Sequence, residues 1–104
     1  MRFINSTLLS WTMKSGAKII VSGTVQGVFF KQFVKEQAGN LGLKGFVRSL
    51  TSGDVEIVVE GEKERIERMA NQVKKGPAHS QIKSVQVEEK KWTGELEDFK
   101  ILRF

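Results

Sequence analysis

The chain has 104 residues, of which 39% are hydrophobic and 28% charged, and its formal net charge is +5. This length accommodates one domain and excludes a second hydrophobic core, and the balance of apolar and charged residues is that of a globular protein rather than a disordered or membrane-embedded one. The absence of cysteine excludes disulfides, thiolate metal sites and a cysteine nucleophile.

The first dozen residues do not resemble a targeting or membrane segment. Polar residues such as Asn5 and Ser10 interrupt every apolar run, so the segment is a poor signal peptide and cannot span a bilayer. Met13 lies directly before the first clear strand pattern. We therefore expect residues 1–12 to be a dispensable N-terminal extension, residues 13–104 to form the domain, and the protein to be cytoplasmic.

The next part of the chain predicts a strand followed by a helix. Residues 17–24 carry a β-branched run at 19–21 and lead into a glycine-containing loop. Apolar side chains then recur at intervals of three and four over 29–41, which indicates an amphipathic helix that ends near Gly42.

The following segment predicts a β-hairpin. Two β-rich stretches, 45–48 and 54–60, flank a polar turn at 51–53. In the second stretch apolar residues alternate with Asp54 and Glu56, which predicts one buried face and one polar face.

The last part of the chain predicts a second helix and two more strands. The second helix has an apolar stripe running from Ile66 to Val73, begins near Glu62 and Glu64, and is closed by residues 74–77. Apolar residues at 82–87 and 99–102 predict the strands. The expected fold class is therefore α+β: a ferredoxin-like βαββαβ sandwich with two helices on one face of an antiparallel sheet and a short extra C-terminal strand.

The loop between the first strand and the first helix is the strongest candidate for a site. Gly23 and Gly27 allow successive backbone N–H groups to point inward and to join the unpaired amides of the first helical turn, which favours an anion. Lys31 follows in the helix and adds a positive charge. The segment has neither the Gly-Lys-Ser/Thr ending of a nucleotide P-loop nor the spacing of a dinucleotide fingerprint, so nucleotide triphosphates are not expected there.

Neither the net charge nor the single histidine indicates a further site. The cations alternate with acids, as at 62–65 and 88–91, which is typical of a mixed solvated surface and argues against a nucleic-acid partner. His79 has no second histidine near it in the sequence, so no metal site is expected.

Two motifs resemble those of the acylphosphatase family. The residues GTVQGVFF at 23–30 resemble that family's signature loop, and LGLKGFVR at 41–48 resembles its second motif. The likeness extends over 17–104. It implies hydrolysis of small acyl phosphates to a carboxylate and phosphate, with no metal or organic cofactor, and acyl phosphate or inorganic phosphate as ligands.

The resemblance also implies roles for individual positions. An arginine at the position of Lys31 holds the phosphate oxygens in the family, and an asparagine at the position of Ser49 orients the attacking water. The backbone amides of the signature loop surround the phosphate, which assigns phosphate binding to Gly23, Val25, Gln26, Gly27, Val28, Phe29 and Phe30.

Both catalytic positions differ from the family pattern, and this leaves two functions open. Lysine keeps the charge but lacks the planar fork of arginine, and a serine hydroxyl is shorter and less versatile than an asparagine amide. We expect weak or impaired acyl-phosphate hydrolysis; the alternative is a non-catalytic module that binds an anion or a phosphorylated ligand. A third function, nucleic-acid binding, is supported by the net charge alone.

Overall fold

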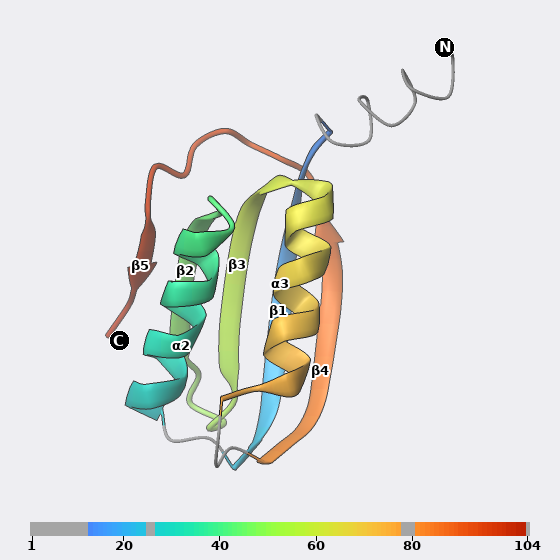
Figure 1. The fold of residues 1–104 in the computed structure, drawn as a ribbon. Helices are drawn as coiled ribbons and strands as arrows, with labels where there is room; N and C mark the ends of the chain where they lie inside the picture. The colour runs from blue at the N-terminus through green and yellow to red at the C-terminus, as the bar shows by residue number, and fades with distance from the viewer. Residues whose placement is uncertain (1–12, 25–26, 78–80, 104) are drawn as a thin grey trace.

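The computed structural model describes residues 13–24, 27–77 and 81–103, which form one layer of strands covered by one layer of helices (Figure 1). The strands are β1 (Lys14–Thr24), β2 (Lys44–Ser49), β3 (Val55–Glu62), β4 (Gln81–Lys90) and β5 (Phe99–Ile101), and the helices are α2 (Gly27–Asn40) and α3 (Lys63–Lys75). The sheet has the strand order β4-β1-β3-β2-β5. The predicted ferredoxin-like α+β fold is confirmed.

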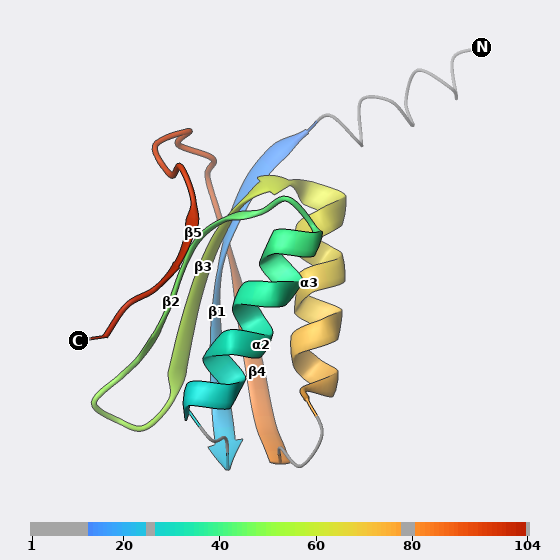
Figure 2. The ribbon, with the colours of Figure 1, turned by 60° about the vertical axis from the view of Figure 1, so that its left-hand side comes forward.

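Both helices cover the same face of the sheet, and no helix among the described residues lies on the other face (Figure 2). α2 packs on β2 and β5, whereas α3 packs on β1, β3 and β4. The core between the layers comes from alternate strand residues and from one stripe of each helix, among them Ile19, Ile57, Phe30 and Met69, each at most 1% exposed. The alternation that predicted a buried face in β3 is thus confirmed.

The pairing of β5 differs from the expected antiparallel sheet. β1, β2, β3 and β4 pair antiparallel, but β5 runs parallel to β2, with Gly45 opposite Phe99. A long connection after β4 carries the chain across to the far edge of the sheet (Figure 1), and this crossover brings β5 in parallel to β2. The sheet is therefore mixed.

The polar face of β3 is less exposed than its alternation predicted. Glu56 is only 7% exposed. Arg48 Nε donates to Glu56 Oε1 at 2.6 Å, and Lys18 Nζ lies 3.6 Å from Glu56 Oε2. Cations on both neighbouring strands therefore cover this carboxylate, a pairing that the pattern of one strand does not reveal.

Candidate functional site

Gly23 holds the end of β1 close to the neighbouring strand. Its φ is +143°, and a Cβ on this residue would stand 2.2 Å from the Gln81 carbonyl oxygen and 2.7 Å from the Lys83 nitrogen. Only glycine avoids both the strained backbone and this clash. The loop of the candidate site therefore starts from a backbone position that no larger residue can occupy without displacing β4.

α2 begins at Gly27, two residues before the predicted start. Apolar periodicity could not indicate this start, because glycine has no side chain to contribute to it. The first four N–H groups of an α-helix have no partner within the helix, and in α2 these belong to Gly27, Val28, Phe29 and Phe30. The first turn carries no acidic residue, so no carboxylate of that turn opposes an incoming anion.

The other predicted loop residues divide between the core and the surface. Phe30 is 1% exposed and anchors α2 in the core, whereas Phe29 is 70% exposed. Val25, Gln26 and His79 lie outside the described residues.

Lys31 lies on the same flank of α2 as Lys35, four residues later. It follows the buried Phe30, so it is turned about 100° from the core side of the helix. Lys35, one turn further along, lines a surface pocket together with Lys44 of β2 and Phe99 of β5. The half-buried Lys31 therefore lies above the β2 and β5 side of the sheet, at the end where α2 begins.

Ser49 is the last residue of β2 and faces the helix layer. Its Cα is paired with that of Val55, and it shares its face of the sheet with Val47; both valines are buried under the helices. Ser49 itself is exposed because it lies at the end of the strand.

The fold brings these elements together at one end of the molecule. The end of β1, the start of α2 and the turn between β2 and β3 lie at the same end in both ribbon views (Figures 1 and 2). Ser49 thus lies at the end where α2 begins, although it is far from the loop in sequence.

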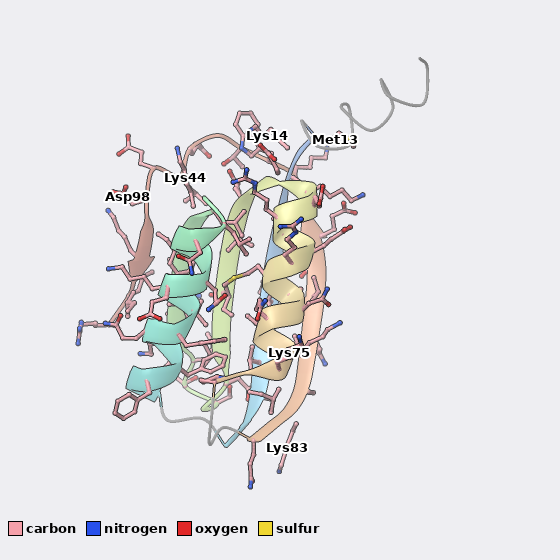
Figure 3. All side chains as sticks on the ribbon, in the orientation of Figure 1. Met13, Lys14, Lys44, Lys75, Lys83 and Asp98 are labelled. Atoms are coloured by element: carbon pink, nitrogen blue, oxygen red, sulfur yellow. The ribbon has the colours of Figure 1, made fainter. Side chains whose placement is uncertain are left out.

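The structure places two further lysines at this end, which no sequence motif indicates. Lys75 closes α3 and Lys83 lies near the start of β4, and Figure 3 labels both at the end where α2 begins. Asp54 in the β2–β3 turn is a negative charge at the same end. The two lysines are remote from the loop in sequence, and only the tertiary structure shows that they lie at the same end of the molecule.

Within the described residues, no three His, Cys, Asp or Glu side chains are grouped so as to hold a metal ion. None of the helices described is both long enough and apolar enough to cross a membrane.

Comparison with known proteins identifies the family. The sequence profile described as Acylphosphatase matches residues 17–101. The chain belongs to the acylphosphatase family. An acylphosphatase from Pelotomaculum thermopropionicum is 41% identical over 88 residues, which cover 85% of this chain and 96% of that protein.

Solved acylphosphatase structures have the same fold. The crystal structure of acylphosphatase from Bacillus subtilis superposes with a TM-score of 0.80 at 33% identity, over 86% of this chain and 99% of that one. An acylphosphatase from Coxiella burnetii gives a TM-score of 0.79 at 35% identity, over 86% of this chain and 93% of that one. The family and the fold support acyl-phosphate hydrolysis.

Proposed function

We propose that the chain binds the phosphoryl group of a small acyl phosphate at the start of α2 and hydrolyses it slowly to a carboxylate and phosphate, without a cofactor. The observation that carries the proposal is the first turn of α2, which follows a glycine loop, contains no acidic residue and is followed by Lys31. Backbone N–H groups and the helix dipole stabilise an anion at such a position.

The reaction depends more on positioning the phosphoryl group and the attacking water than on covalent catalysis by the protein. Water attacks phosphorus, the bond between phosphorus and the acyl oxygen breaks, and the carboxylate leaves. Charge on the equatorial oxygens is stabilised by preorganised donors. The first-turn N–H groups and the Lys31 ammonium supply such donors, and Ser49 is the polar side chain of β2 that faces this end.

Lys31 and Ser49 account for the low rate that we propose. A lysine ammonium is a point charge, so it attracts phosphate without fixing two oxygens in one plane. A serine hydroxyl has a shorter reach, whereas an asparagine side-chain amide offers both a donor and an acceptor group. Loss of one preorganised contact typically lowers kcat by about 10²–10³-fold.

The same two residues favour a second candidate function, a binding module without catalysis. The helix start retains its donors for an anion even if water is not aligned for attack. In that case the chain binds phosphate or a phosphorylated ligand and releases it unchanged.

Hydrolysis of an aryl acyl phosphate distinguishes the two functions. The wild type is compared with Lys31→Arg, Ser49→Asn and the double variant, and phosphate binding is measured on each by calorimetry. Lys35→Arg and Ser84→Asn are matched controls, since Lys35 lies one turn further along α2 and Ser84 is an exposed residue of β4.

We expect a slow wild type and a double variant faster by at least about 10²-fold, with both controls at the wild-type rate. An inert wild type that still binds phosphate establishes the binding module. A wild type as fast as the double variant contradicts the roles given to Lys31 and Ser49, and the absence of both binding and hydrolysis contradicts both functions.

A further inference from the structure

A buried carboxylate holds the turn that follows β4. Glu60 of β3 is 8% exposed, and its Oε2 accepts hydrogen bonds from the Thr93 backbone N–H at 3.1 Å and from the Thr93 hydroxyl at 2.9 Å. The Gly94 N–H donates to Glu60 Oε1 at 3.1 Å. Three donors on one buried carboxylate fix this turn to the sheet, because releasing them would leave a charge buried without partners.

This turn positions Trp92. Gly94 has a φ of +73°, and a Cβ on it would stand 2.8 Å from Cη2 of the Trp92 indole. The indole is therefore packed over Gly94, while Trp92 remains 49% exposed. An aromatic ring that is already held in place loses little conformational entropy when a second planar group stacks on it.

Lys90 and Lys91, which precede Trp92 in the chain, lie close to β1. A Cβ on Gly16 of β1 would stand 3.2 Å from the Lys91 carbonyl oxygen and 3.3 Å from that of Lys90. The backbone that carries these two lysines therefore lies directly against β1, and their positions relative to Trp92 are set by the sheet.

Trp92 and four lysines line one pocket of ≈ 530 Å³. The lysines are Lys14, Lys63, Lys90 and Lys91, and Glu89 is the only acidic residue among the lining residues that the structure describes. This volume lies within the range of about 300–1,000 Å³ that is typical of small-molecule sites.

Two of the four lysines have no acidic partner among the described residues. Lys63 Nζ lies 3.9 Å from Glu89 Oε2, and Lys90 Nζ lies 2.9 Å from Glu88 Oε2. Lys14 and Lys91 form no ion pair within the part of the chain that the structure describes. The pocket therefore combines a fixed aromatic surface with uncompensated positive charge.

The pocket is remote from the start of α2. Figure 3 labels Met13 and Lys14 where β1 begins, at the opposite end of the sheet from Lys75 and Lys83. A ligand bound here makes no contact with the proposed phosphate site, so the two sites can be tested independently.

From this arrangement we propose that the pocket binds a nucleotide, with the base stacked on Trp92 and the phosphate held by Lys14 and Lys91. Base stacking on an aromatic side chain contributes about 1–3 kcal/mol. Inorganic phosphate alone would leave the indole unused, and an uncharged aromatic ligand would leave the ammonium groups unused. A free nucleotide and one unit of a single strand present the same chemistry.

The test uses the full chain with Trp11→Phe, which leaves Trp92 as the single tryptophan of the two in the sequence. Quenching of its fluorescence is followed during titration with AMP, adenosine and inorganic pyrophosphate. We expect AMP to bind at least about tenfold more tightly than adenosine or pyrophosphate, because only AMP satisfies both the ring and the lysines.

Variants of the pocket residues test whether AMP binds in this pocket. By calorimetry, Trp92→Leu and the double variant Lys14→Ala/Lys91→Ala should each weaken AMP binding by at least about tenfold. The matched double variant Lys35→Ala/Lys100→Ala, on α2 and β5, should bind AMP like the wild type. Far-ultraviolet circular dichroism confirms that each variant is folded.

Two results would overturn the proposal: AMP binding no tighter than adenosine or pyrophosphate binding, or full affinity in Trp92→Leu. A short oligonucleotide distinguishes the two sources of the ligand. If it binds much more tightly than AMP, the natural ligand is a single strand, and equal affinity indicates a free nucleotide.

Discussion

The two helices start at opposite ends of the molecule (Figure 1). Their first turns differ in whether the chain itself supplies acceptors and a carboxylate at the positive end of the helix dipole. At the start of α3 the Lys63 N–H donates to the Met13 carbonyl at 2.9 Å, and Glu64 lies in the first turn. The first turn of α2 has no acidic residue, and Lys31 follows it. The chain therefore stabilises the start of α3 with its own acceptors, whereas the first turn of α2 contains no carboxylate of its own, which is consistent with the external anion that we propose there.

The Glu60 carboxylate illustrates the same principle within the chain. Backbone N–H groups of Thr93 and Gly94 converge on it, as the first-turn N–H groups of α2 would converge on phosphate. In the proposed site, as at Glu60, backbone donors would bind an oxyanion, and the difference is that the Glu60 oxyanion belongs to the protein.

The largest expected effect comes from a substitution at the end of β1, where the chain leads into α2. Gly23→Ala should lower the free energy of unfolding by about 2–4 kcal/mol, because its Cβ would meet the β4 backbone and its φ is unfavourable for alanine. Gly39→Ala is the matched control: beyond its chain neighbours and the local helix backbone, no atom lies within 4 Å of its Cβ position, so the helix should gain about 0.5–1 kcal/mol. Urea denaturation measures both, and equal stability of the two variants would contradict the close packing at Gly23.

The next largest effect comes from making the start of α2 resemble that of α3. Phe29→Glu places a carboxylate in the first turn at an exposed position, and it should weaken phosphate binding by about tenfold through charge repulsion. Phe29→Gln introduces a side chain of nearly the same shape as glutamate but without its charge, so this variant should bind phosphate like the wild type. Calorimetry compares the two, and equal affinities would mean that the anion binds elsewhere.

Removing the acidic side chain from the first turn of α3 should have a smaller effect. Glu64→Gln loses the interaction with the helix dipole and the charge on the hydrogen bond from Arg68 Nη2, 3.1 Å away, and we expect a loss of about 0.3–1 kcal/mol in the free energy of unfolding. Phosphate affinity should not change. A change in phosphate affinity would show that the two helix starts are coupled.

Deletion of residues 1–12 should have the smallest effect. Met13, whose carbonyl accepts the hydrogen bond from Lys63, is retained, so stability and phosphate affinity should stay within experimental error of the full chain. Deletion of residues 1–15 is the contrasting variant, since it also removes the pairing of Lys14 with Glu62 and of Ser15 with Gly61. A thermal melt separates the two, and equal destabilisation by both deletions would show that the extension contributes to the fold.

The sequence predicts the helices and most strands well, and its errors have identifiable physical causes. The stripe from Ile66 to Val73 predicts α3 because apolar periodicity is a local property. The start of β1 at Lys14 is missed because residues 14–16 have no apolar alternation, and they become a strand only by pairing with β3 and β4. The burial of Glu56 is missed because its partners, Lys18 and Arg48, lie on other strands.

The sequence by itself determined the order of the elements, the buried stripes of the two helices, and the glycine loop before α2, because each depends on residues close together in the chain. Only the tertiary structure decided that Ser49 lies at the end where α2 begins, that β5 joins β2 in parallel, and that lysines from β1, α3 and β4 share a pocket with Trp92. These neighbours meet through strand pairing and helix packing, which connect segments that no local pattern relates.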